Sequence, residues 1–130
     1  MKSRDAVYKL RRYELQERLR TVADLESMIR DFEQLASDLE RQVSVEEDRT
    51  GVKDPKHFAY STFAKSVAQR RDNLRVSVGD LKAKLDAARL ECEEASANLS
   101  KAETVDAREI ERTRRTGTSS SERGSSLPVG

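Results

Sequence analysis

A seven-residue repeat of apolar residues runs through most of this 130-residue chain, and a short segment with glycine and proline interrupts it near residue 51. Before the interruption, the first series of the repeat consists of Tyr8, Leu15, Val22, Ile29, Ala36 and Val43. A second series lies three or four residues away and consists of Leu19, Leu25, Phe32 and Leu39, widened by Met28 and Leu35. Because a strict seven-residue repeat keeps one face of a supercoiled helix against its partner, this segment predicts a coiled coil.

The same repeat resumes after the interruption. Its two series are Tyr60, Val67, Leu74, Leu81, Ala88, Ala95 and Ala102, and Ala64, Val78, Leu85, Cys92 and Leu99. Arg71 breaks the second series, which is costly unless the arginine reaches water or pairs with an acidic group of the first helix. It either fixes the register or marks a point where the helices separate. Alanines replace leucines toward the C-terminal end, which indicates close backbone approach or a weaker end.

The interrupting segment, RTGVKDPKH, predicts a turn between two helices. Gly51 is typical of a helix C-terminus, and Asp54 followed by Pro55 is typical of a helix start. The second helix then begins near residue 59, or near Ser61 if the residues from Pro55 onward form a short turn. In either case the connection is short enough to bring the two helices together antiparallel.

Local charge favours the same arrangement. Residues 21–50 carry nine acidic and three basic side chains, whereas residues 51–75 carry two acidic and six basic side chains. Folding at the turn places these opposite charges side by side, and parallel pairing of two copies would place like charges together. We therefore expect an all-α fold of two long helices in an antiparallel coiled-coil hairpin. The expected boundaries are a hairpin over 1–115, with helices at about 4–49 and 59–113 and a loop at about 50–58, and a disordered, flexible Ser/Gly-rich tail over 116–130.

The sequence lacks the motifs of common enzymes. It contains no glycine-rich phosphate loop and no Gly-x-Ser-x-Gly turn, and its one histidine and one cysteine cannot form the usual zinc site. A hairpin of two helices also offers no deep pocket. We expect a protein that is not an enzyme, with no catalytic, cofactor or metal site and no small-molecule substrate.

Net charge and apolar content predict the compartment and exclude some partners. The net charge of +1 favours neither nucleic acid nor an anionic membrane. The sequence has one cysteine and no apolar segment with the length of a signal peptide core or a membrane span. We expect a cytoplasmic protein that does not bind nucleic acid.

Three of the six aromatic residues and the only histidine lie between residues 51 and 74. Tyr60 belongs to the repeat and Phe63 flanks it, whereas His57 and Phe58 precede it. These side chains either form a small apolar plug that closes the hairpin, or stay exposed as an anchor for a partner. The charged segment RRDNL, residues 70–74, follows them.

Four stretches in this order resemble one protein family. They are MKSRD at the start, the basic segment YKLRRYELQE, DPKHFAYSTFAK and RRDNL. Together they are similar to the FliJ-type flagellar export proteins, most closely to their alphaproteobacterial branch. The resemblance extends from residue 1 to about residue 115 and does not include the Ser/Gly-rich tail.

The resemblance implies a small antiparallel coiled coil of the bacterial flagellar type III protein export apparatus, a cytoplasmic protein associated peripherally with the inner membrane at the flagellar base. Proteins of this family sit in the pore of the hexameric export ATPase, contact the membrane-embedded export gate, and help to handle export chaperones in flagellum assembly and motility. Hydrolysis of ATP belongs to the ring. The resemblance implies that the ATPase ring is contacted by Lys9, Arg11, Arg12 and Arg18. It implies that the export gate is contacted by His57, Phe58, Phe63, Arg70 and Asp72.

Two alternatives from other classes stay open. One is a holdase chaperone that binds unfolded proteins at the tip of a coiled-coil hairpin. The other is a structural coiled-coil adaptor unrelated to flagella. An export component is expected to stimulate its ATPase, whereas a holdase is expected to suppress the aggregation of unrelated proteins.

Overall fold

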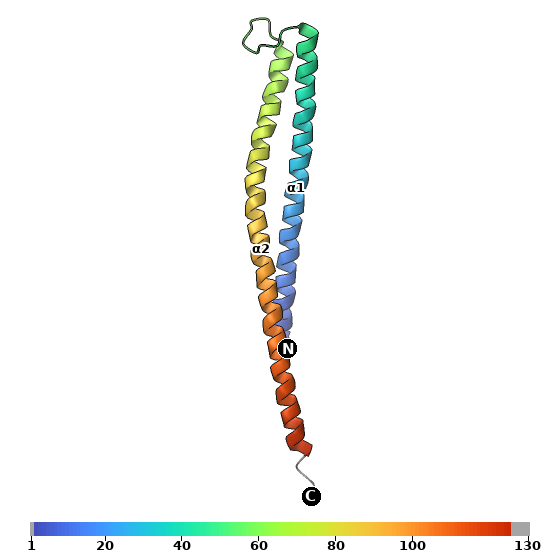
Figure 1. The fold of residues 1–130 in the computed structure, drawn as a ribbon, viewed down its shortest axis with the longest axis vertical. Coiled ribbons are helices and arrows are strands. Elements are labelled where there is room, and N and C mark those ends of the chain that lie inside the picture. The colour runs from blue at the N-terminus through green and yellow to red at the C-terminus, as the bar shows by residue number, and fades with distance from the viewer. Residues whose placement is uncertain (1, 126–130) are drawn as a thin grey trace. The chain divides into compact units, whose positions relative to one another are not determined.

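The chain folds into two helices in the computed structural model, which describes the backbone of residues 2–125 and the side chains of residues 3–117. Helix α1 spans Lys2–Thr50 and helix α2 spans Thr62–Ser125, and the described residues form no strand. The two helices pack against each other antiparallel, which confirms the predicted fold class (Figure 1). The chain divides into two compact units. We call Leu19–Leu90 the loop unit, and Met1–Arg18 with Glu91–Gly130 the terminal unit.

Apolar residues of the repeat form the core of the loop unit. One cluster consists of Ile29, Val78, Leu81 and Leu85, with Val22, Leu25 and Phe32 packed against it. The other consists of Leu39, Val43 and Val67, with Ala68 and Leu74 packed against it. All of these residues except Ala68 belong to the predicted series, so the repeat identified the core of this unit correctly.

Three residues of the predicted stripe are exposed instead. The exposed fractions are 51% for Leu19, 43% for Met28 and 42% for Leu35. Met28 and Leu35 each precede a buried residue of the first series by one position, and one position turns a side chain by about 100° around a helix. The packed face is therefore narrower than the sequence indicated.

Ion pairs join the helices of the loop unit, with the acidic residues on α1 and the basic residues on α2, as predicted. Lys82 Nζ lies 3.2 Å from Glu33 Oε1, and Arg71 Nη1 lies 2.6 Å from Glu40 Oε2. In both pairs α1 supplies the carboxylate and α2 supplies the cation. The pairing of the acidic part of α1 with the basic start of α2, predicted from local charge, is confirmed.

We call the contact between α1 and α2 the seam. In the terminal unit the seam is more polar than in the loop unit and contains less apolar volume. On α1 the half-buried residues include Arg4, Tyr8, Arg11 and Leu15. On α2, Ala95 is the buried apolar residue of the described part of this unit, and Cys92, Leu99 and Ala102 are half-buried. The alanine-rich seam predicted from the sequence is thus matched by arginines on the other helix.

Gly51 ends α1, as predicted. Its φ angle is +76°, in the left-handed region that glycine adopts without strain, and its N–H donates a 2.8 Å hydrogen bond to the carbonyl of Glu47. Thr50 Oγ1 accepts a 3.3 Å hydrogen bond from the next amide, that of Val52. The first bond satisfies the carbonyl of Glu47 in the last turn, and the second holds Val52 at the end of the helix.

Ser61, not Asp54, caps the start of α2. Its Oγ accepts a hydrogen bond from the backbone N–H of Ala64 at 3.1 Å. Asp54 instead accepts a 2.9 Å hydrogen bond at its side chain from the amide of Lys56, within a turn. The structure therefore agrees with the alternative in which α2 begins after Ser61, and the connection is longer than the predicted loop of 50–58.

At its other end α2 continues past the predicted boundary near residue 113 and ends at Ser125. No proline occurs among residues 116–125, so no residue of this segment lacks the backbone N–H that a helix requires. The predicted tail over 116–130 therefore starts within α2. Its last five residues, 126–130, lie outside the described residues.

Two glycine substitutions are expected to change stability in opposite directions. At both Gly51 and Gly79 an added Cβ would meet no atom within 4 Å, so backbone conformation decides the outcome. Gly51→Ala is expected to lower the free energy of unfolding by about 1 kcal/mol because φ is positive there. Gly79→Ala is expected to raise it by about 0.5–1 kcal/mol because the residue is inside a helix. Urea denaturation followed by circular dichroism tests both, and two changes of the same sign would contradict the assignment of the turn.

Candidate functional site

The loop between the helices presents an exposed aromatic pair. Phe58 is 97% exposed, and its ring stacks on that of His57 with 4.6 Å between ring centroids and an interplanar angle of 24°. The predicted apolar plug therefore does not include Phe58, since an almost fully exposed ring covers no core.

Local hydrogen bonds hold the loop in a defined conformation. Nδ1 of His57 accepts a hydrogen bond from the amide of Ala59 at 3.0 Å, and the His57 carbonyl accepts one from the amide of Tyr60 at 3.0 Å. The amide of His57 donates to the carbonyl of Asp54 at 3.0 Å. The histidine thus fixes the turn on both of its sides, and the ring that supports Phe58 belongs to a folded segment.

Two side chains tie the loop to the end of α1. The Tyr60 hydroxyl donates a 2.7 Å hydrogen bond to Glu47 Oε2, and Ser61 Oγ donates a 3.0 Å hydrogen bond to Glu46 Oε1. A hydrogen bond from Arg49, followed by a weaker one from Ser61, lowers the pKa of Glu46 and keeps its carboxylate ionised. Tyr60 therefore orients the loop, in which His57 and Phe58 stay exposed.

The bond between Tyr60 and Glu47 predicts a loss of stability at alkaline pH. The hydrogen bond to Glu47, with desolvation as the second cause, raises the pKa of Tyr60 from 10.0 to about 12. The folded state thus favours the protonated phenol, and this contribution is fully present below pH 10.0 and is lost as pH rises through about 12.

We expect Tyr60→Phe to be less stable than the original protein at neutral pH, by a difference that shrinks as pH rises above 10.0. Denaturant midpoints measured over a series of pH values give this difference directly. Tyr13→Phe, at a side chain that is 60% exposed, is the matched control. A Tyr60→Phe difference that is constant across the alkaline range would contradict the hydrogen bond.

The remaining predicted gate residues lie on the first turns of α2. Phe63 is 55% exposed, and Arg70 and Asp72 are exposed. Asp72 is engaged within the chain, because Arg71 Nη2 lies 2.9 Å from its Oδ1. Arg71 also pairs with Glu40 of α1, which is one of the two outcomes that the sequence left open for it. The structure therefore brings together His57 and Phe58, and it places Arg70 and Asp72 farther along α2.

The predicted ring-facing cations fall into two groups. Lys9 and Arg12 are exposed on α1, and the Arg12 guanidinium carbon lies 5.8 Å from the centroid of the Tyr8 ring. Arg11 and Arg18 instead lie on the side of α1 that faces α2. Arg18 Nη1 is 2.9 Å from Glu91 Oε2, and Arg11 donates a 3.1 Å hydrogen bond to Glu14 of its own helix. Arg11 and Arg18 are thus engaged with carboxylates of the chain, and Lys9 and Arg12 are exposed.

Two classes of site find no support among the described residues. No cluster of three or more histidine, cysteine, aspartate or glutamate side chains there could hold a metal ion. None of the helices described combines the length and apolar character needed to cross a membrane.

Comparisons of the chain with protein-family models, with curated proteins and with solved structures give no match.

Proposed function

We propose that this protein is a non-enzymatic component of the bacterial flagellar type III export apparatus. In this role it is cytoplasmic, binds the hexameric export ATPase through the terminal unit, and binds the cytoplasmic domain of the export gate through its loop. The observation that carries the proposal is the stacked His57–Phe58 pair, exposed on an ordered loop that two antiparallel helices support. The ordered set of four sequence stretches that resembles the FliJ-type proteins supplies the identity of the partners.

The loop suits a protein partner for a physical reason. An aromatic side chain that is already held in place loses little conformational freedom on binding, and buried aromatic anchors contribute much of the affinity of small interfaces. Lys9 and Arg12 suit a different contact, since exposed cations on a helix steer association with an acidic surface and contribute less once bound.

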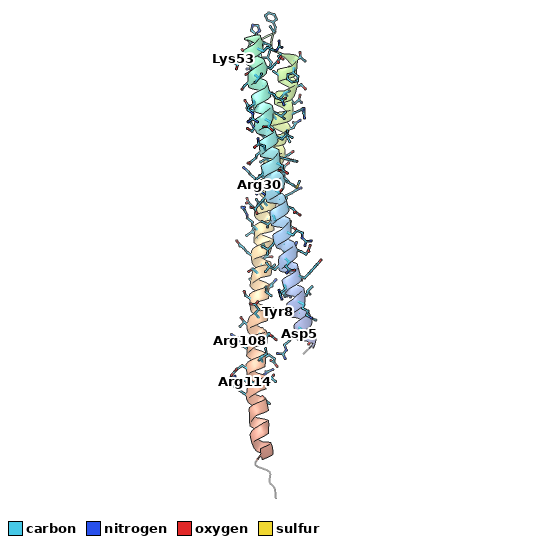
Figure 2. The ribbon with its side chains drawn as sticks, turned by 90° about the vertical axis from the view of Figure 1, so that its right-hand side faces the viewer. Asp5, Tyr8, Arg30, Lys53, Arg108 and Arg114 are labelled. Atoms are coloured by element: carbon cyan, nitrogen blue, oxygen red, sulfur yellow. The ribbon has the colours of Figure 1, made fainter. Side chains whose placement is uncertain are left out.

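The test is the rate of ATP hydrolysis by the purified export ATPase of the same organism, measured with and without this protein. We expect stimulation by the full chain and a loss of most of it in Lys9→Glu/Arg12→Glu. Arg30→Glu/Lys84→Glu is the matched control, because both residues are exposed on the helices of the loop unit (Figure 2 labels Arg30). No stimulation by the full chain, or equal losses in the two double variants, would contradict the proposal.

The exposed Phe58 also suits a holdase, which binds unfolded chains through apolar tips. A holdase suppresses the aggregation of unrelated denatured proteins and has no effect on the export ATPase. Suppression without ATPase stimulation would therefore assign the protein to that class. Binding to purified export chaperones, measured by isothermal titration calorimetry, is expected only for the export component.

A further inference from the structure

A groove of about 400 Å³ lies between the helices of the terminal unit. Val7 of α1 and Ala102 and Val105 of α2 provide its apolar surface. Val7 is 48% exposed and Val105 is 58% exposed, so these side chains are left open by the packing of α1 on α2. The groove exists because arginines and alanines occupy the seam here, where leucines fill it in the loop unit.

The rim of the groove is positively charged. Its lining includes three cations, Arg4, Arg11 and Lys101, and one carboxylate, that of Asp106. Nη1 of Arg4 is buried and makes no hydrogen bond within the described part of the chain. It lies 3.9 Å from Asp106 Oδ1, which is an ion-pair distance but too long for a hydrogen bond. The ion pair with Asp106 offsets part of the cost of burying this charge, and the exposed Lys101 is left to attract an added carboxylate at the rim.

Apolar surface continues beyond the groove along α2. Ile110 is 57% exposed and follows Asp106 by one turn on the same face of the helix. Figure 2 shows Asp5 and Tyr8 of α1 beside the part of α2 before Arg108, and Arg114 farther along α2, past the start of α1. The groove is thus open at one end, toward an uncovered stretch of α2.

From these features we propose that the groove binds an amphipathic helix of another protein whose apolar face is flanked by glutamate or aspartate. The apolar anchors of that helix pack on Val7, Ala102 and Val105. A flanking carboxylate pairs with Lys101 at the rim of the groove. This is helix-in-groove recognition, in which side chains spaced by three or four residues supply the anchors. The groove residues are distinct from Lys9 and Arg12, and the inference does not depend on the proposed function.

The probe is a synthetic helical peptide of about 20 residues, long enough to be helical in water, with leucines along one face and glutamates beside them. Its binding to the full chain is measured by fluorescence anisotropy. We expect a dissociation constant in the range of about 10–100 µM, as befits a small interface. A peptide with lysines in place of the glutamates is expected to bind at least about tenfold more weakly, because like charges then meet at the rim.

Two variants of the chain locate the binding. Val105→Glu and Lys101→Glu are each expected to lower the affinity of the chain for the acidic peptide by about tenfold. Their matched controls are Val76→Glu, at an exposed valine of the same helix, and Lys84→Glu, and both are expected to bind as the original chain does. Circular dichroism confirms that all four chains are folded.

Any of three results would overturn the inference. The first is the absence of binding at about 1 mM peptide, and the second is equal binding of the acidic and basic peptides. The third is a dimer of the chain in sedimentation that Val105→Glu dissociates, which would assign the groove to a second copy. The assay contains no ATPase, so a failure here leaves the ATPase test of the proposed function unaffected, and the reverse also holds.

Discussion

Replacing Leu39 with alanine is expected to lower the free energy of unfolding by about 3 kcal/mol. Leu39 is 2% exposed and packs in one cluster with Val43 and Val67. Removal of its branched end leaves a cavity between two helices that cannot close without moving their backbones. The loss is large for a protein of this size, because small domains have only about 5–15 kcal/mol of net stability.

The control for this change lies one turn earlier on the same helix. Leu35 is 42% exposed, and Leu35→Ala is expected to cost less than about 1 kcal/mol. Urea denaturation followed by far-ultraviolet circular dichroism measures both, at equal protein concentrations. Similar losses in the two variants would mean that the wider apolar stripe, with Leu35 inside it, is the packed face.

Under the proposed function, Phe58→Asp is expected to weaken binding to the cytoplasmic domain of the export gate by about 10–100-fold while leaving the stability of the chain unchanged. The ring is 97% exposed, so its removal costs the free protein no packing. A carboxylate at that position would have to be desolvated in the interface, which adds to the loss of the aromatic anchor. Isothermal titration calorimetry with the purified domain gives the affinity, and urea denaturation gives the stability.

Val45→Asp is the matched control, because Val45 is 68% exposed on α1 in the same unit as the loop. We expect it to bind the gate domain as the original protein does. Phe63→Asp, at a ring that is 55% exposed, tests how far the site extends from the loop onto α2. An unchanged affinity in Phe58→Asp would remove the loop from the gate contact, and an equal loss in Val45→Asp would indicate a general effect of added charge.

The features predicted best from the sequence are those that depend on the seven-residue repeat. The buried residues of the loop unit, among them Ile29, Leu39 and Leu81, all belong to that repeat. Gly51 ended the first helix as expected, because a positive φ angle strongly favours glycine. For Arg71 the sequence left two outcomes open, and the structure shows the ion pair with a carboxylate of the first helix.

The seam of the terminal unit was missed, although the sequence contained a signal for it. Counting back by sevens from Leu25 gives Arg18, Arg11 and Arg4. In the terminal unit Arg18 pairs with Glu91 of α2, and Arg4 lies 3.9 Å from Asp106 of α2. Leu19 was predicted in the packed face because it is apolar, but it is exposed. Here the spacing of seven residues predicted which side chains of α1 face α2 better than hydrophobicity did. The reason is that long arginine side chains can lie between helices while their charged ends reach carboxylates or water.

The geometry of the loop could not be deduced from residue types alone. Both Asp54 and Ser61 are good helix caps, and the choice between them depends on contacts across the turn. Ser61 reaches Glu46 of α1 with its hydroxyl, a contact between residues far apart in sequence. For the same reason the sequence left open whether Phe58 covers the core or faces outward, and the turn around His57 decided it.

Carbodiimide crosslinking of the native chain tests most directly that α1 folds back antiparallel on α2 within one molecule. The reagent joins an amine to a carboxylate in contact with it, and Lys82 Nζ lies 3.2 Å from Glu33 Oε1. In an equal mixture of unlabelled and isotopically labelled chains, mass spectrometry is expected to find Lys82 linked to Glu33 in peptides from a single chain. Two results would contradict the antiparallel hairpin. One is linked peptides that combine a labelled and an unlabelled half. The other is a crosslink from Lys82 mainly to carboxylates of α2 in a second copy.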